Sequence, residues 1–358
     1  MTTSTTSTSR INARSAGMFG KMNRFSLDYK LEDLKPSRNV TVFSTFSCGG
    51  GSSIGYKRAG FNVLGNVEID PKINAMYVKN NHPKYNYCED LRDFNKREDL
   101  PEELYHLDIL DGSPPCTSFS TCGVRDRDWG KEKKFREGQA KQTLDDLFFV
   151  FLDTVEKLQP KIVIAENVPG LMTGKAKGHV NLIVKRFREL GYDVQAFKLN
   201  AGLMDVPQTR HRVFFIANRM NYPKLRLEFD YDPIKFGSIR DEKGLVAESG
   251  PLKGMLELAK PNEKKLAQVS KRLVGDGSSY FSHCIVNDEE VCPTVTASGQ
   301  YYRFYDKRRF TDNDFRRVQS FPEDYDFCGN NVQYVTGMSV PPNMMANVAE
   351  EVYEQWLK

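Results

Sequence analysis

Cys116 is the side chain with the clearest potential for covalent chemistry, because it directly follows two prolines at the end of an apolar run, residues 107–111. The run predicts a strand, and active sites of open α/β sheets lie at the carboxyl ends of strands. A Pro-Pro step restricts the backbone and removes two N–H donors, so the thiol would leave the sheet in a rigid turn. A thiolate presented in this way could act as a nucleophile. The alternative is a cysteine that only fills a gap in the core.

Two further groups could act beside this thiol. Glu166 ends the apolar run 161–165, which places it at the same sheet edge as Cys116, where burial could keep a carboxyl protonated and usable as an acid. Alternation places Gln208, Arg210 and Arg212 on one face before the last predicted strand. Arginines spaced by two can hold a base edge or a phosphate. The alternatives are a capping or ion-paired glutamate and a pair of surface arginines.

A glycine-rich loop at 46–51 follows the first predicted strand and leads into a helix, which is a context typical of nucleotide-type ligands. Glu68 ends the next strand, where a carboxylate can accept a hydrogen bond from a ribose hydroxyl. Asp90 follows the next segment and could accept one from an adenine amino group. Each acid could instead lie at the surface or cap a helix, but the ordered series predicts a cofactor that carries adenosine.

The elements that must position these residues alternate along the chain. Strand patterns at 40–46, 61–67, 162–165 and 213–216 alternate with helical patterns, of which 144–158 and 180–190 are the clearest. This order predicts an α/β fold with a doubly wound, mostly parallel sheet and helices on both faces. After Asn218 the periodicity is lost, which predicts a smaller, irregular second domain. A capping box at Thr311 opens a helix through Val318, and 343–357 predicts a closing helix.

Composition limits the class of protein. The 358 residues carry a net charge of +4, and none of the seven cysteines forms a Cys-x-x-Cys pair, which favours reduced thiols in the cytoplasm. The five histidines have no ligand spacing, so we expect no metal. No apolar run is long enough to span a membrane. Basic residues mixed with aromatics at 301–317, and a basic cluster at 125–136, suit nucleic acid, although both could be solvated charged faces.

Taken in order, these motifs resemble the cytosine-C5 DNA methyltransferase family. The matching segments are 46–51, Glu68, Asp90, 114–120, 166–168, 208–212, 308–322 and 337–342. The resemblance covers the chain from residue 40 to its end except about 220–290, where the family has its variable target-recognition domain. Four positions depart from the family pattern: Ser44 and Cys48 replace the usual Asp and Gly, Thr117 replaces Gln, and Met338 replaces Asn.

The resemblance implies a class I, Rossmann-like enzyme that uses S-adenosylmethionine. It divides the chain into a disordered tail and lead-in at 1–36, a catalytic and cofactor-binding domain at 37–218, a target-recognition domain at 219–305, and C-terminal motifs at 306–358 that return to the catalytic domain. The reaction would proceed through a flipped cytosine and a bond between Cys116 and carbon 6. The residues expected at the site are catalytic Cys116, Glu166, Arg210 and Arg212; cofactor-binding Phe46, Ser47, Gly49, Gly50, Gly51, Glu68, Ile69, Asp90, Leu91, Pro114, Met338 and Ser339; and DNA-binding Ser118, Ser120, Arg125, Arg127, Gln208, Arg303 and Tyr305.

The resemblance also implies its partners. We expect a monomer that binds double-stranded DNA, associated with the nucleoid in a bacterial cell, together with a restriction endonuclease of the same specificity if the chain is part of such a pair. Three alternatives stay open: a tRNA-methylating enzyme of the same family, an inactive DNA-binding module, and an amino-methyltransferase. The last normally has Tyr or Phe where this chain has Cys116. The sequence does not predict the DNA recognition site.

Overall fold

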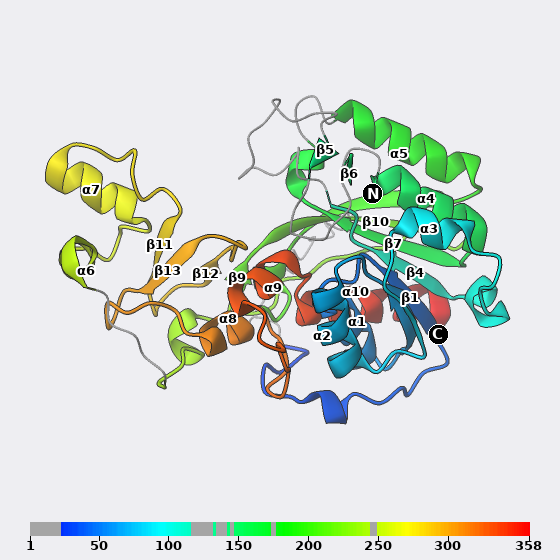
Figure 1. The fold of residues 1–358 in the computed structure, drawn as a ribbon, viewed down its shortest axis with the longest axis horizontal. Helices are drawn as coiled ribbons and strands as arrows, with labels where there is room; N and C mark the ends of the chain where they lie inside the picture. The colour runs from blue at the N-terminus through cyan, green and yellow to red at the C-terminus, as the bar shows by residue number, and fades with distance from the viewer. Residues whose placement is uncertain (1–22, 116–131, 134–141, 144–146, 173–176, 244–248) are drawn as a thin grey trace, which may run out of the picture.

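The computed structural model describes residues 23–115, 132–133, 142–143, 147–172, 177–243 and 249–358. A seven-stranded sheet forms the larger of two lobes, in the order β3-β2-β1-β4-β7-β10-β8 (Figure 1). Strand β10 runs antiparallel to both neighbours, and the other pairs are parallel, which confirms the predicted mostly parallel α/β sheet. Its strands are β1 (Thr41–Thr45), β2 (Asn62–Val67), β3 (Tyr85–Tyr87), β4 (Ile109–Gly112), β7 (Ile162–Asn167), β8 (Asp193–Asn200) and β10 (His211–Asn218).

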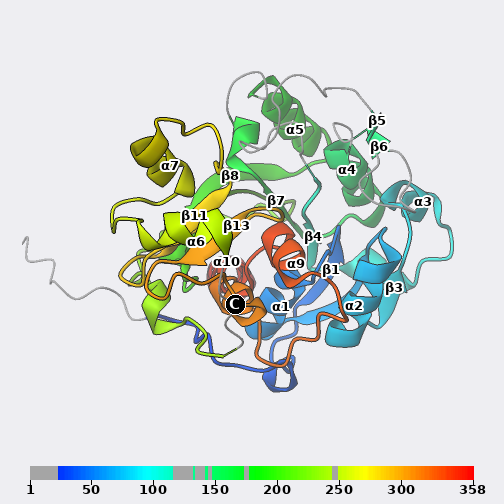
Figure 2. The same ribbon diagram turned by 60° about the vertical axis from the view of Figure 1, so that its left-hand side comes forward.

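Helices cover both faces of this sheet (Figure 2). One face carries α3 (Leu91–Lys96), α4 (Leu147–Leu158) and α5 (Lys177–Glu189), and the other carries α1 (Gly51–Arg58), α2 (Pro71–Asn81) and α10 (Pro342–Val352). A separate hydrophobic cluster fills each interface. Because α10 packs on α1 over the sheet, the last helix of the chain completes the core beside the first one.

The smaller lobe has more regular structure than predicted. Its elements are α6 (Gly250–Glu257), α7 (Leu266–Val274), β11 (His283–Val286), β12 (Cys292–Pro293) and β13 (Gln300–Arg303). Strands β11 and β13 pair in parallel, and β12 pairs with β9 (Gln208–Thr209), which lies just before β10. Elements this short do not sustain a sequence period, so the pattern between 219 and 297 failed to predict them.

The core of the smaller lobe extends beyond residue 305. Phe310, Phe315 and Val318 share a hydrophobic cluster with Phe236 and Val286. The first of these precedes α8 (Asp312–Val318), whose predicted capping box is present: the Thr311 hydroxyl accepts from the Asp314 N–H at 3.1 Å, and the Asp314 carboxylate accepts from the Thr311 N–H at 2.8 Å. Helix α9 (Val332–Met338) links the two lobes, because Val332 belongs to this same cluster while Val335 packs with Ile54 and Met76 of the larger lobe.

The segment that leads into the first strand makes hydrogen bonds with later parts of the chain. The backbone N–H groups of Arg24 and Phe25 donate to the Asp205 carboxylate, and the buried Tyr29 hydroxyl donates to the carbonyl of Ser320 at 2.8 Å. The disorder predicted for residues 1–22 falls outside the described residues. The remaining short elements are the strand pair β5 (Glu132–Lys133) and β6 (Gln142–Thr143), the 3-10 turns Leu31–Asp33, Glu102–His106, Pro169–Met172, Ala201–Leu203 and Phe236–Ser238, and the closing turn Tyr353–Leu357.

No helix within the described ranges is long and apolar enough to cross a membrane.

Candidate active site

The carboxyl ends of β1, β4 and β7 bring three predicted segments to one edge of the sheet. These strands are neighbours and run parallel, so the glycine-rich loop, Pro114 and Glu166 follow one another along that edge. The side-chain amide of Asn167 donates to the Pro114 carbonyl at 3.2 Å. This contact ties the turn that leads to Cys116 to the strand end that carries Glu166. Cys116 itself lies outside the described residues, as do Ser118, Ser120, Arg125 and Arg127.

Glu166 and Arg212 form an ion pair at this edge. The Arg212 Nε lies 2.7 Å from Glu166 Oε1, and both side chains are nearly buried. The antiparallel register of β7 and β10 produces the pair, because Phe214 lies opposite Glu166 and Arg212 is two residues along on the same face. Burial raises the pKa of Glu166 above its ordinary value, and the charges of Arg212 and Arg210 oppose that shift. Burial and the two arginines thus act in opposite directions on the pKa of this carboxyl.

Arg210 anchors backbone segments. It is fully buried and donates to the carbonyls of Val295 at 2.9 Å, Gly337 at 2.8 Å and Ser339 at 3.1 Å. Burial and the neighbouring charge of Arg212 lower its pKa. The side chain thus joins the strand entry to the smaller lobe and to the C-terminal segment.

Gln208 has the same anchoring character. It is also fully buried, donates to the Gln319 side-chain oxygen at 2.5 Å, and accepts from the Val295 N–H at 2.9 Å. Gln208 was predicted to contact DNA, but its side chain is not exposed in this structure. Both the nitrogen and the oxygen of its amide bond to groups inside the protein. We therefore assign Gln208 to the junction between the lobes.

The glycine-rich loop has an unusual backbone that is held by Glu68. Phe46 and Cys48 both have positive φ values, 52° and 44°, and Gly50 begins α1 in the left-handed conformation. Non-glycine residues adopt this region at an energetic cost, and such residues cluster at binding sites. Glu68 Oε2 accepts from the Cys48 N–H at 2.9 Å, and Oε1 accepts from the Asp70 N–H at 2.9 Å. Burial raises the pKa of Glu68, and these N–H bonds offset part of the shift.

The C-terminal segment closes tightly against this loop. A Cβ added to Gly51 would lie 2.0 Å from the Val340 carbonyl oxygen, and one added to Gly49 would lie 2.9 Å from the Ser339 hydroxyl. The Tyr325 hydroxyl donates to the Gly49 carbonyl at 2.7 Å. The loop and Ser339, which were each predicted to bind the cofactor, therefore lie next to each other. Sequence reasoning missed Tyr325, since a tyrosine far along the chain carries no signal of this contact.

The other residues predicted to hold the cofactor lie around the same loop or at the neighbouring strand end. Ser47 is buried and accepts from the Asn66 side-chain amide at 3.1 Å, while Asn66 Oδ1 is buried without a hydrogen-bond partner among the described residues. Asp90 caps α3 and pairs with Arg92 at 3.1 Å, which favours the capping alternative but leaves its carboxylate partly exposed. Of the rest, Leu91 and Pro114 are buried, Phe46 and Ile69 are half-buried, and Met338 is half-exposed.

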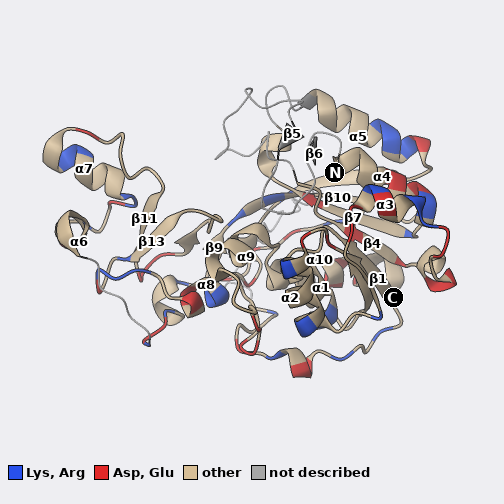
Figure 3. Cartoon of the chain, viewed as in Figure 1, with Lys and Arg blue, Asp and Glu red and all other residues tan. Residues whose placement is uncertain are grey.

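Arg303 has a different position from the one predicted. It is fully buried, and its Nη2 lies 2.5 Å from Asp314 Oδ2, which is also fully buried. A guanidinium enclosed in this way cannot reach a DNA phosphate, so we assign Arg303 to the core of the smaller lobe. Tyr305, two residues on, is 69% exposed and available to a ligand. Other basic side chains occur on α5 and α7 (Figure 3).

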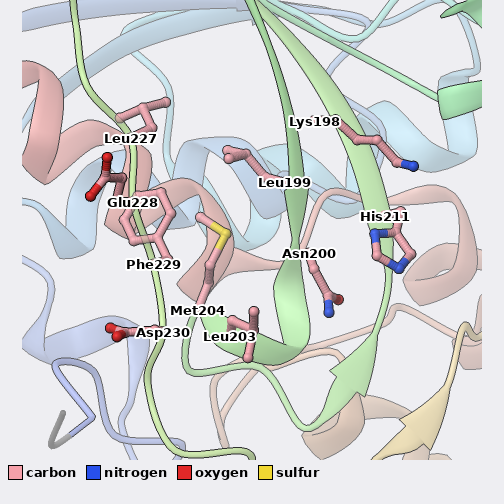
Figure 4. Close-up of a pocket in the computed structure, with 10 residues that line it drawn as sticks. All are labelled: Lys198, Leu199, Asn200, Leu203, Met204, His211, Leu227, Glu228, Phe229 and Asp230. Atoms are coloured by element: carbon pink, nitrogen blue, oxygen red, sulfur yellow. The ribbon is translucent and has the colours of Figure 1, made fainter. Parts of the chain in front are cut away.

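A separate cavity of about 560 Å³ lies between β8, the start of β10 and the segment 227–230 (Figure 4). Lys198 and His211 line one wall, and Phe229 and Asp230 line the other. None of the predicted site residues lines it. His211 faces this cavity while its sequence neighbours Arg210 and Arg212 make the contacts described above, so the cavity is distinct from the candidate active site.

Comparisons with known proteins identify the family of this chain and agree with its fold. The family model for C-5 cytosine-specific DNA methylases matches residues 40–354. Type II methyltransferase M.NgoPII of Neisseria gonorrhoeae is 30% identical over 87% of this chain and 95% of its own. M.Sau96I of Staphylococcus aureus is 30% identical over 92% of this chain and 80% of its own.

Solved structures show the same fold. An E. coli prophage protein superposes with a TM-score of 0.63 at 22% identity, covering 89% of this chain and 100% of its own. The Dnmt2 methyltransferase of S. pombe gives 0.59 at 15% identity, with 90% and 100% covered. The fold and the site thus define a methyltransferase of the α/β class. The chain belongs to the C-5 cytosine-specific DNA methylase family, whose members use S-adenosylmethionine.

Proposed function

We propose that the protein methylates carbon 5 of one cytosine within a specific double-stranded DNA sequence, using S-adenosylmethionine, through a covalent bond between Cys116 and carbon 6 of the flipped base. The observation that supports this most directly is the Glu166–Arg212 pair, which lies beside the turn that leads into Cys116. A buried carboxyl whose pKa is raised, next to a fixed cation, suits a group that gives a proton to a ring nitrogen and stabilises developing charge.

The proposed roles follow from the chemistry of the base. Carbon 5 of cytosine is a poor nucleophile, and it becomes an enamine carbon once a thiolate adds to carbon 6. The Cys116 sulfur would form that bond while Glu166 donates a proton to N3, and Arg212 would hold the base oxygen and the carboxyl. When bound, S-adenosylmethionine supplies the methyl group that carbon 5 takes up. Water would then take the proton from carbon 5, the electron pair of that C–H bond would form the C5–C6 double bond as the C6–S bond breaks and releases the thiolate, and N3 would return its proton to Glu166.

The residues present fit the proposed cofactor. Buried polar groups surround the glycine-rich loop, and one of them, Asn66 Oδ1, has an unused acceptor among the described residues. Glu68 and Asp90 offer carboxylate oxygens at successive strand ends, which suits hydroxyl and amino donors. In this proposal Ser47 and the loop glycines hold the amino-acid part, Glu68 the ribose and Asp90 the adenine.

DNA would bind across the two lobes. A target base is stacked inside a duplex and must be flipped out to reach Cys116. We assign phosphate or base contacts to Ser118, Ser120, Arg125, Arg127 and Tyr305, and sequence recognition to the smaller lobe. The protein would act as a monomer. A restriction endonuclease that cuts the same sequence would be its partner.

A cysteine replacement tests the central step. Cys116→Ala should abolish methyl transfer to DNA from radiolabelled S-adenosylmethionine while duplex binding is kept. Cys284→Ala is the matched control, because Cys284 lies in β11 of the smaller lobe and its loss should leave transfer unchanged. Transfer that survives in Cys116→Ala would refute the mechanism.

A trapped adduct supplies the complementary measurement. DNA with fluorine at carbon 5 of the target cytosine has no proton to lose there, so the wild-type protein should stay covalently attached in a denaturing gel.

Sequencing of 5-methylcytosine in DNA from cells that express the chain would report substrate and recognition site together. DNA binding without an adduct or methylation would instead indicate an inactive binding module, and methylated tRNA would indicate the RNA branch of the family.

A further inference from the structure

Asp111 is a buried carboxylate at the centre of the sheet that the proposed mechanism does not use. It lies in β4, three residues before Pro114, and is 1% exposed. Its Oδ2 accepts from the Ser44 hydroxyl at 2.7 Å, and its Oδ1 accepts from the Tyr56 hydroxyl at 3.1 Å. Both donors are neutral and equally buried. No ion pair links Asp111 to a basic side chain within the described ranges.

The carboxylate lies directly behind the glycine-rich loop. Ser44 is in β1, just before the loop, and Tyr56 is in α1, just after it, so one carboxylate bonds to the two elements that flank the loop (Figure 1). The strand order also reverses between β1 and β4. The chain continues from β1 to β2 on one side of β1, whereas β4 pairs with β1 on the opposite side. Ligands of open α/β sheets bind at such a point.

The pairing of Ser44 with Asp111 explains a departure in the sequence. Ser44 stands where related sequences usually have an aspartate, and in this chain Asp111 is its register partner on the adjacent strand. The carboxylate that contacts position 44 therefore comes from the adjacent strand in this chain. A buried charge without a counter-ion is costly, so burial raises the pKa of the Asp111 carboxyl, and a positive charge bound nearby would favour its ionised form.

We propose that Asp111 provides the negative charge that makes this site prefer a cationic sulfonium cofactor over its neutral demethylated product. The inference rests on the proposed use of S-adenosylmethionine. Asp111 is a positioning residue in this scheme, since it bonds to Ser44 and Tyr56, which flank the loop proposed to hold the ligand. The two ligands differ by one methyl group and one charge, so their affinity ratio reports electrostatics and cancels most effects of shape.

A pH dependence accompanies this role. Four groups face Asp111: the Ser44 and Tyr56 hydroxyls, Glu166 from β7, and the Tyr77 phenol from α2. Burial raises the pKa of Asp111 to about 7, and the Glu166 charge adds to the shift. Bound sulfonium would favour the ionised carboxylate, so affinity for S-adenosylmethionine should fall as the pH drops from 8 to 6. Affinity for S-adenosylhomocysteine, which has no sulfonium charge, should change much less.

The experiment measures dissociation constants of both ligands by calorimetry with the full-length protein. In Asp111→Asn, which keeps the side-chain shape and removes the charge, the preference for S-adenosylmethionine should fall roughly tenfold, the factor that corresponds to one pK unit of coupling. The pH dependence should disappear with it. Asp205→Asn is the matched control, because Asp205 is a buried acid that accepts from Phe25 and Asn347 away from the loop, and its loss should leave the ratio unchanged.

Two further measurements complete the test: the affinity ratio of a charge-swap variant, and the pH dependence of that ratio in the wild-type protein. Ser44→Asp combined with Asp111→Ser returns the carboxylate to the neighbouring strand and should restore the preference. If Asp111→Asn weakens both ligands equally, Asp111 is only structural and the inference is overturned. If Asp111→Asn does not fold, a flat pH dependence of the wild-type ratio would overturn it as well. Failure of the wild type to bind either ligand would refute the proposed function itself, which distinguishes the two failures.

Discussion

The buried pair of Arg303 and Asp314 yields a prediction that separates a core role from contact with DNA. Asp314 accepts from Arg303 Nε at 3.0 Å and Nη2 at 2.5 Å, and also from the backbone N–H groups of Thr311 and Asp241, each at 2.8 Å. Arg303→Met keeps the volume of the side chain and leaves a buried carboxylate without its cation. Breaking such a pair costs about 3–5 kcal/mol, and the two remaining N–H bonds favour the lower end of that range.

The assay is chemical denaturation, combined with duplex binding at several salt concentrations. Arg303→Met should lose about 3 kcal/mol of unfolding free energy, whereas Lys271→Met, an exposed change on α7, should stay within about 0.5 kcal/mol. The double change Arg303→Met with Asp314→Asn should recover part of the loss, because it removes the unpaired charge and keeps an amide oxygen that can accept from one of the two backbone N–H groups. A small loss of stability together with a salt slope of binding reduced by about one would refute this reasoning, since it would show that Arg303 contacts a phosphate.

Three further perturbations have defined outcomes. Gly51→Ala should destabilise the protein by about 1–3 kcal/mol and weaken cofactor binding, because its Cβ would meet the Val340 carbonyl at 2.0 Å, whereas Gly178→Ala has open space and should be neutral or stabilising in thermal denaturation. Glu166→Gln should lower the rate of methyl transfer about 10²–10⁴-fold and leave the cofactor dissociation constant unchanged. Burial raises the pKa of Asp111 from 3.8 to about 7, so the folded state keeps a proton that the unfolded chain loses, and stability falls as pH rises through this window. Asp111→Asn should therefore gain in melting temperature over the wild type at pH 8 and gain little at pH 4; an equal change at both values would contradict the assignment.

The larger lobe could be predicted from the sequence because its elements are strongly patterned. Helix α4 has a nearly continuous apolar face, and β7 is a buried run of Ile and Val, so both were recognised with bounds close to those observed. Strand β8 was not predicted, because its residues alternate irregularly between exposed and half-buried at the edge of the sheet. Helices α6 and α7 were not predicted either, because helices of eight and nine residues are too short to establish a helical period in the sequence.

The site could be predicted only in part. Neighbouring parallel strands end at the same edge, so the proximity of Glu166 to the Pro114 turn followed from the order of the motifs. The burial of Arg303 could not be predicted, because an arginine in a basic, aromatic segment looks the same in sequence whether it faces solvent or a buried carboxylate. Asp111 was missed for a similar reason, since its partner Ser44 lies 67 residues away along the chain.

The contact between the glycine-rich loop and the C-terminal segment also has a consequence for biosynthesis. Gly51 packs against the Val340 carbonyl and α1 packs against α10, so the ligand-binding side of the sheet lacks part of its wall until the last helix has been made. Residues 51 and 340 are 289 positions apart, which at 5–20 residues per second corresponds to roughly 15–60 s of translation. A nascent chain would therefore stay inactive toward DNA until α10 has been made, and a product terminated before residue 340 would lack activity even with every catalytic residue in place.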